Sequence, residues 1–145
     1  MRNFTYPASL IPEDRGRFTV RFADLPEAIT SGDTRSQALV NAADCLEEAV
    51  ASRIVDGLDI PPASKPKRGA ALVTLTGSMA AKTSLYLTMR EQGVSRSDLA
   101  RRVGVDEKEV RRMLDPRHAT KLPRIEEALG VLGRRLIVSL EPNAA

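Results

Sequence analysis

Residues 95–115, with the sequence SRSDLARRVGVDEKEVRRMLD, predict two short helices joined by a tight turn. Ser95 can accept a hydrogen bond from the backbone of Asp98, and the Asp98 side chain can return one, which makes a capping box at the start of the first helix. Asp106 takes the same position in front of the second helix, with Glu109 at the third helical position. Both helices therefore have a defined first residue.

The residues between the two caps favour a sharp crossing of the helices. Ala100 is small enough for a close approach, and Gly104 allows a positive φ where the chain turns. Apolar side chains at suitable positions would hold the helices together: Leu99, Val103, Val105, Val110 and either Met113 or Leu114. This spacing predicts a helix-turn-helix, an arrangement that places its second helix in the major groove of DNA.

The flanking segments extend the motif to a domain over residues 77–145. Residues 78–92 predict a preceding helix, and an apolar pattern near the C-terminus predicts a following one, through Ile125, Ala128, Leu129 and Leu132. Residues 135–140, which include the β-branched Ile137 and Val138, predict a short final strand. Because a lone strand leaves an edge exposed, we expect it to pair with another strand, for instance its copy in a dimer.

The N-terminal residues predict a β-hairpin. Apolar and polar residues alternate with the period of two that is typical of half-buried strands, first through Phe4, Tyr6, Ala8 and Leu10 and then through Phe18, Val20 and Phe22. Residues 12–16 have the composition of a turn. Pro7 cannot donate a hydrogen bond to a neighbouring strand, so we expect the first strand to be an edge strand or to contain a bulge.

A long amphipathic helix and one more strand complete the first half. Thr34 predicts the N-cap and Gln37 a capping box, residues 30–34 lead into the helix, and Gly57 marks its end. Residues 70–76 predict the next strand after a proline-rich connection. The fold class expected for the chain is α+β: a small β-β-α-β sheet with one packed helix over residues 1–76, followed by the helical domain.

Composition and charge limit the classes of function that the chain could have. Residues 1–62 have 6 Lys and Arg against 10 Asp and Glu, and residues 63–145 have 16 against 9, so the net charges are −4 and +7. The basic half is suited to nucleic acid and the acidic half to a basic partner. One Cys and one His argue against a disulfide and against a zinc site of the Cys/His type, and favour a cytoplasmic location; no cofactor is expected. No apolar run is long enough to cross a membrane.

Two stretches resemble known families. Residues 99–116 are similar to the Cro/repressor type of helix-turn-helix. FADLP at residues 22–26, TSGDT at residues 30–34 and the acidic helix that follows resemble the HicB antitoxins. The resemblance implies an N-terminal domain with a degenerate RNase H-like fold that blocks a small HicA-type, mRNA-cleaving toxin. It also implies a C-terminal domain that binds operator DNA and represses its own operon, without enzymatic activity.

The expected DNA contacts divide into two groups. The N-terminal residues and outer face of the second helix would contact bases: Asp106, Glu107, Lys108, Arg111 and Arg112. The remaining polar and basic residues would contact phosphates: Ser95, Ser97, Arg101, Arg117 and Lys121. Repressors of this type bind near-palindromic sites as dimers, so a homodimer or a larger homo-oligomer is expected.

The acidic residues of the first half are the candidates for toxin binding: Asp24, Asp33, Asp44, Glu47 and Glu48. Two other hypotheses remain open. The protein could be a stand-alone repressor whose first domain senses a small molecule. Alternatively, Asp14, Asp24 and Asp33 could hold a divalent metal in a nuclease, although all three occur in predicted turns where Asp is common. His118 is predicted in a loop near the DNA, and Cys45 in the core.

Overall fold

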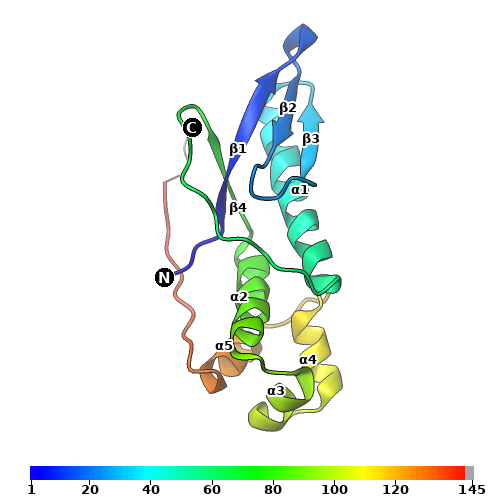
Figure 1. The fold of residues 1–145 in the computed structure, drawn as a ribbon, viewed down its shortest axis with the longest axis vertical. Coiled ribbons are helices and arrows are strands. Elements are labelled where there is room, and N and C mark those ends of the chain that lie inside the picture. The colour runs from blue at the N-terminus through cyan, green and yellow to red at the C-terminus, as the bar shows by residue number, and fades with distance from the viewer. Residues whose placement is uncertain (143–145) are drawn as a thin grey trace. The chain divides into compact units, whose positions relative to one another are not determined.

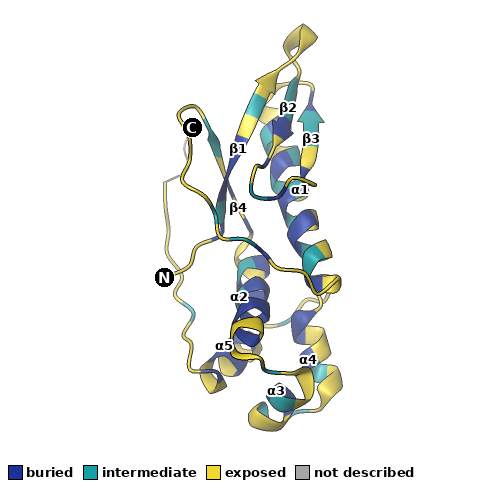
Figure 2. Cartoon of the chain, viewed as in Figure 1, coloured by how far each residue is buried: buried dark blue, intermediate teal, exposed yellow. Residues whose placement is uncertain are grey.

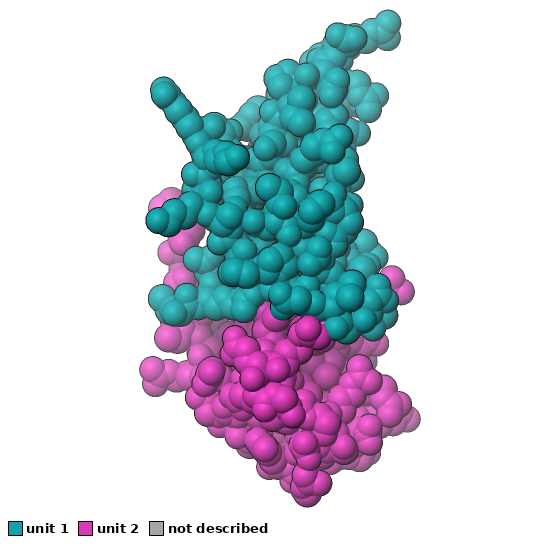
Figure 3. Space-filling model, viewed as in Figure 1, with its two compact units in different colours: residues 1–80 teal, residues 81–145 magenta. Residues whose placement is uncertain are grey.

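A computed structural model describes residues 1–142 of the chain. The chain divides into two compact units, Met1–Ala80 and Ala81–Ala145 (Figure 3). The division falls inside helix α2 (Gly77–Gln92), which therefore begins in the first unit and continues in the second.

The first unit is an antiparallel sheet covered by one helix (Figure 1). The strand order is β3-β2-β1-β4, with β1 at Thr5–Pro12, β2 at Phe18–Arg21, β3 at Ile29–Gly32 and β4 at Ala71–Thr74. In β4 the buried Val73 lies between the exposed Leu72 and Thr74, and in β2 the buried Val20 precedes the exposed Arg21, whereas β1 buries Tyr6, Pro7 and Ala8 in a row. The sheet therefore has one buried face, and helix α1 (Arg35–Val55) packs on the sheet.

The sheet differs from the predicted one in its number of strands. The α+β class is confirmed, but the prediction of three strands was wrong, because Ile29–Gly32 forms β3 and pairs with β2. This segment has only four residues, and its Thr-Ser-Gly composition is typical of a turn. Pairing with β2 stabilises this segment as a strand, and the local sequence gives no indication of that pairing.

The first strand was predicted to be an edge strand or to contain a bulge, and β1 as a whole is not an edge strand, because it lies between β2 and β4. Its two halves nevertheless have different neighbours: Thr5 to Ala8 pair with β4, and Ser9 to Pro12 pair with β2. Phe4 accepts a hydrogen bond from the Leu75 N–H at 3.1 Å, so the alternation of an antiparallel ladder turns the nitrogen of Pro7 away from β4. The missing N–H thus lies on the side where β2 has already ended.

Helix α1 begins where its sequence predicts. The Thr34 hydroxyl accepts a hydrogen bond from the Gln37 N–H at 3.1 Å, but the Gln37 side chain donates to Asn41 instead of returning to the cap. Only half of the predicted capping box is therefore present. The helix buries small and apolar residues along one side (Figure 2): Ala38, Ala42, Leu46, Ala49, Val50 and Ile54.

The first turn of α1 lies unusually close to the end of β3. A Cβ atom placed on Gly32 would lie 2.3 Å from the backbone nitrogen of Ala38, far inside van der Waals contact. The atoms that the added Cβ would meet belong to the backbone of α1, so they cannot move aside as a flexible side chain could. Gly32 is required by this contact and not by its backbone conformation.

The second unit is helical. After α2 come α3 (Arg96–Val103), α4 (Glu107–Leu114) and α5 (Leu122–Val131). The predicted core residues of these helices are buried: Leu85, Met89, Leu99, Val110, Met113, Leu114, Ile125, Ala128, Leu129 and Leu132. Val103 and Val105 are only half-buried.

The strand predicted at residues 135–140 is not formed within the described chain. These residues have no regular secondary structure, and Ile137, Val138 and Leu140 are exposed. A strand needs the backbone of a neighbour for its hydrogen bonds, and the β-branched composition supplies the preference but not the neighbour.

We predict that Gly32→Ala lowers the free energy of unfolding by at least about 2 kcal/mol, because the added methyl group overpacks a backbone contact. Chemical denaturation followed by circular dichroism measures the loss. Gly130→Ala is the matched control, since its Cβ would meet nothing within 4 Å and alanine is a better helix former than glycine. Equal free energies of unfolding for the two variants would contradict the predicted overpacking at Gly32.

Candidate nucleic-acid interface and partner surface

Helix α3 begins with the complete capping box that the sequence predicts. The Ser95 hydroxyl accepts from the Asp98 N–H at 3.1 Å, and the Asp98 carboxylate accepts from the Ser95 N–H at 3.5 Å. The Ser95 hydrogen bonds, followed by the ion pair with Arg101, lower the pKa of Asp98 below its usual range. The Asp98 carboxylate therefore stays charged, and both side chains of the box form hydrogen bonds within the chain.

The turn between α3 and α4 has the geometry that its sequence predicts. Gly104 has φ +83° and donates its N–H to the carbonyl of Ala100 at 2.9 Å, which ends α3. The Asp106 carboxylate then accepts from the Glu109 N–H at 2.8 Å and caps α4. Asp106 thus has a structural role in addition to its proposed DNA contact.

The exposed side of α4 is formed by polar and charged residues. Val110, Met113 and Leu114 face the core, while Glu107, Lys108, Arg111 and Arg112 are exposed. Two arginines of this surface have acidic partners: Arg111 with Glu107 at 3.9 Å, and Arg112 with Glu109 at 3.5 Å. Exposed pairs of this kind contribute little and are screened by salt, so a phosphate or a base can replace the acidic partner.

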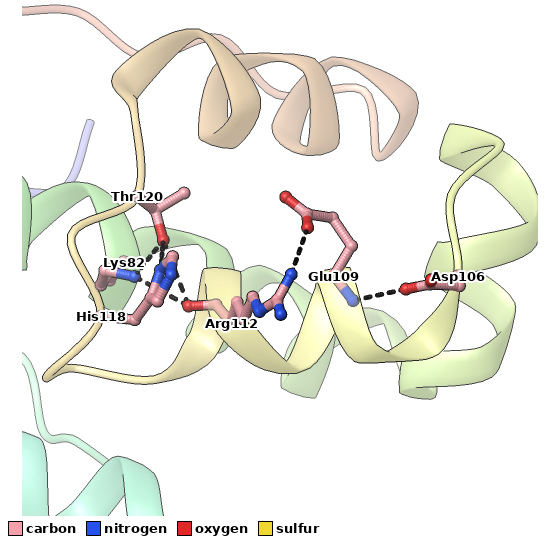
Figure 4. Close-up of polar contacts among 6 residues, drawn as sticks. All are labelled: Lys82, Asp106, Glu109, Arg112, His118 and Thr120. Atoms are coloured by element: carbon pink, nitrogen blue, oxygen red, sulfur yellow. Dashed lines mark hydrogen bonds and ion pairs between the residues drawn. The ribbon is translucent and has the colours of Figure 1, made fainter.

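A buried lysine meets the far end of α4, and sequence reasoning missed it. The Lys82 ammonium group on α2 donates to the carbonyls of Arg112 and Met113 at 3.1 and 3.0 Å, and to the Thr120 hydroxyl at 2.7 Å (Figure 4). Burial lowers the pKa of Lys82, and the nearby charge of Asp115 partly opposes that shift. Its position in a mostly polar stretch of α2, KTS, gave no sequence indication of burial.

The loop after α4 contains the remaining proposed phosphate contacts. Arg117 and Lys121 are exposed, and the Arg117 N–H donates to the Asp115 carboxylate at 2.9 Å. His118 Nδ1 lies 3.1 Å from the Thr120 hydroxyl, which places the imidazole beside the lysine network (Figure 4). The same loop thus combines exposed cations with a buried anchor.

The predicted partner residues of the first unit lie on different segments of the chain. Asp44, Glu47 and Glu48 follow one another on α1, and Glu47 accepts from the backbone N–H of Thr76 at 2.9 Å. Asp24 lies in a loop and accepts from both the N–H and the hydroxyl of Ser64, at 3.0 and 3.1 Å. Asp33 forms an exposed ion pair with Arg17 at 3.4 Å.

The carboxylates proposed for a nuclease are likewise dispersed. Asp14 is in the turn between β1 and β2, whereas Asp24 and Asp33 have the partners given above. Within residues 1–142, no group of three or more His, Cys, Asp or Glu residues is placed to hold a metal ion. Cys45 is half-buried on α1, and burial raises the pKa of its thiol.

Comparison with known proteins assigns the family. The family model described as "HicB_like antitoxin of bacterial toxin-antitoxin system" matches residues 5–84. The chain is also 38% identical over 135 residues to Antitoxin HicB 2 of Photorhabdus laumondii, a match that covers 93% of this chain and 95% of that protein. The chain belongs to the HicB-like antitoxin family.

Other HicB antitoxins are similar to this chain over nearly its whole length. Antitoxin HicB of Pseudomonas fluorescens is 36% identical over 90% of both chains. Antitoxin HicB of Escherichia coli K12 is 32% identical over 90% of this chain and 95% of its own. The similarity to these HicB proteins therefore extends over both units. No helix within residues 1–142 combines the length and the apolar character needed to span a bilayer.

We predict that Asp106→Ala lowers the melting temperature of the second unit, at a cost of about 1 kcal/mol, because the Glu109 N–H loses its acceptor. Asp106→Asn keeps an acceptor at the N-cap, so its cost is expected to be less than half as large. Differential scanning calorimetry of the full chain compares the two variants. Equal losses would mean that the charge of Asp106, and not its capping hydrogen bond, stabilises α4.

Proposed function

We propose that this HicB-like protein neutralises a cognate HicA-type, mRNA-cleaving toxin through residues 1–76 and represses its own operon through residues 77–145. The observation that carries the second part is the pair of capped helices α3 and α4, joined by a glycine turn, with Lys108, Arg111 and Arg112 exposed on α4. The first part rests on the family. Both partners, a toxin and DNA, are consistent with a cytoplasmic protein.

On the DNA side, α4 is the proposed recognition helix. Its N-terminal residues and outer face would approach base edges: Asp106, Glu107, Lys108, Arg111 and Arg112. Arg and Lys can donate to guanine, and Glu107 can accept from cytosine. Ser95, Ser97, Arg101, Arg117 and Lys121 would contact phosphates and fix the register of the helix on the duplex.

Repression of this kind usually involves two copies of the helix-turn-helix on a near-palindromic site. The exposed apolar residues Ile137, Val138 and Leu140 support an association of this segment with a second copy. We therefore propose a homodimer or a larger homo-oligomer, in which residues 135–140 would gain the strand neighbour that they lack in a single chain.

On the toxin side, the outer surface of α1 is the proposed docking site. We use the term α1 outer surface for Val40, Asp44, Glu48 and Val55, which are all exposed. Val40 and Val55 are 57% and 71% exposed, and the two carboxylates lie between them in the sequence. A protein that binds mRNA is expected to be basic, so this combination of acidic and apolar groups would both attract it and bury its apolar surface.

We predict that Arg111→Ala and Arg112→Ala together weaken binding of the operator at least tenfold and leave toxin binding unchanged, because they remove two cations from α4 only. Fluorescence anisotropy with a duplex from upstream of its own gene, at fixed salt, measures the loss.

Arg35→Ala is the control, since Arg35 is an exposed arginine at the start of α1. Unchanged operator affinity in the double variant would refute the choice of α4 as the recognition helix. Since Arg35→Ala loses one positive charge and the double variant loses two, a loss of binding free energy half as large in Arg35→Ala would indicate an effect of net charge alone.

We predict that Asp44→Lys with Glu48→Lys weakens toxin binding more than tenfold and abolishes protection of cells that express the toxin, because two attractive charges become repulsive. Isothermal titration calorimetry with the purified toxin gives the affinity. Glu126→Lys with Glu127→Lys on α5 reverses the same number of charges in the second unit and should leave the affinity unchanged. Full toxin affinity in the α1 variant would move the docking site to another surface.

A further inference from the structure

Lys82 occupies an unusual place for a cation. Its side chain belongs to a residue that is only 3% exposed, and its three described acceptors are two backbone carbonyls and a hydroxyl rather than a carboxylate (Figure 4). Taking an ammonium group out of water is costly unless all its donors are satisfied. Here three acceptors match the three N–H groups of the lysine.

The two carbonyls belong to the end of the α-helix, where no i+4 backbone N–H is available, although the Arg112 carbonyl also accepts from the C-cap N–H of Asp115. Arg112 and Met113 belong to the last turn of α4, whose carbonyls have no intrahelical partner and form the negative end of the helix dipole. A positively charged donor at this position both hydrogen-bonds to these carbonyls and compensates the negative end of the dipole. Lys82 therefore joins the C-terminal end of α4 to the side of α2.

The third acceptor links the lysine to the loop after α4. The Thr120 hydroxyl accepts from Lys82 and lies 3.2 Å from the Arg112 carbonyl, which also accepts from the Asp115 N–H at 3.2 Å. Asp115 and Thr120, at the two ends of this loop, therefore both donate a hydrogen bond to the Arg112 carbonyl. Arg117 and Lys121, the proposed phosphate contacts, lie within or directly after this closed segment.

We infer that Lys82 is a positioning residue for DNA binding, which holds the recognition helix α4 and the phosphate-contacting loop in a fixed relation to each other on α2. This inference rests on the proposed function. It assigns to a buried residue, with no expected contact to DNA, control over whether base and phosphate contacts can form at the same time.

A role in stability alone would have a different consequence. Removing one partner of a buried polar contact is most costly when it leaves an unpaired charge behind, and the three acceptors of Lys82 are neutral, so Lys82→Met can stay folded. It would still leave the Arg112 and Met113 carbonyls without the cation, and α4 without its attachment. The titratable side chains facing the network, Asp115 and His118, remain in both proteins, so they do not account for a difference.

The test compares Lys82→Met with Lys65→Met in the full chain. Each variant loses one positive charge, but Lys65 is exposed in the first unit. Fluorescence anisotropy at fixed salt gives the affinity for a duplex from upstream of its own gene and for an unrelated duplex of equal length. We expect Lys82→Met to bind the first duplex about tenfold more weakly and the second less than twofold more weakly, with Lys65→Met unchanged.

A second pair of variants covers the case in which Lys82→Met does not fold. Thr120→Val removes one acceptor of the network, and Thr88→Val removes a buried hydroxyl of α2 that bonds to the Ser84 carbonyl at 2.7 Å. We expect specific binding to fall about threefold in Thr120→Val only. Folding of each variant is checked by its melting curve.

The inference would be overturned if a folded Lys82→Met bound the operator with the affinity of the wild type. If Lys82→Met does not fold, the same result for Thr120→Val would overturn it. An equal loss of affinity for both duplexes would also overturn it. An equal loss reflects fewer folded molecules and not a displaced helix. A wild type that binds the two duplexes equally would instead refute the proposed repressor function. The failure of the inference and the failure of the proposed function are thus distinguishable.

Discussion

An eight-residue helix is not stable by itself in water, because nucleation costs more than so few hydrogen bonds return. Helices α3 and α4 both have this length, so the candidate DNA-binding surface depends on what holds their ends. Ser95 and Asp106 satisfy the first turns, Gly104 ends α3, and Lys82 satisfies the last turn of α4. Packing through Leu99 and Val110 adds the remaining stabilisation.

This dependence explains why polar residues of the site have two tasks. Ser95 and Asp106 were expected to contact DNA, yet their side chains cap helices. Capping uses one acceptor and leaves the rest of the exposed side chain available, so the two roles are compatible. Arg111 and Arg112 are paired with nearby carboxylates, and these weak, screened pairs keep the guanidinium groups at the surface without committing them.

The first unit is stabilised differently, because its short strands depend on contacts with neighbouring strands and with α1. Gly32 allows β3 to end directly against α1, and Glu47 on α1 accepts from Thr76 just after β4. Arg53 near the end of α1 forms an ion pair with Glu27 at 2.6 Å, which lowers the pKa of that carboxyl. The helix thus fixes both the loop before β3 and the chain after β4, while Val40 and Val55 remain exposed.

The sequence by itself determined most features that arise within a few residues, with the side chain of Gln37 as an exception. The capping box at Ser95, the left-handed turn at Gly104 and the apolar spacing of the helices depend on contacts between positions up to four apart, so local composition predicts them. The division of charge between the two halves, and the resemblance to HicB antitoxins, were likewise evident from the residues alone.

Only the tertiary structure decided the features that depend on distant partners. Strand β3 exists because β2 lies beside it, Pro7 is accommodated where β2 ends, and residues 135–140 form no strand without a neighbour. Lys82 meets acceptors that are 30, 31 and 38 residues away in the sequence. A long-range hydrogen bond leaves no periodic pattern in the chain, because its geometry is set by packing and not by spacing along the backbone.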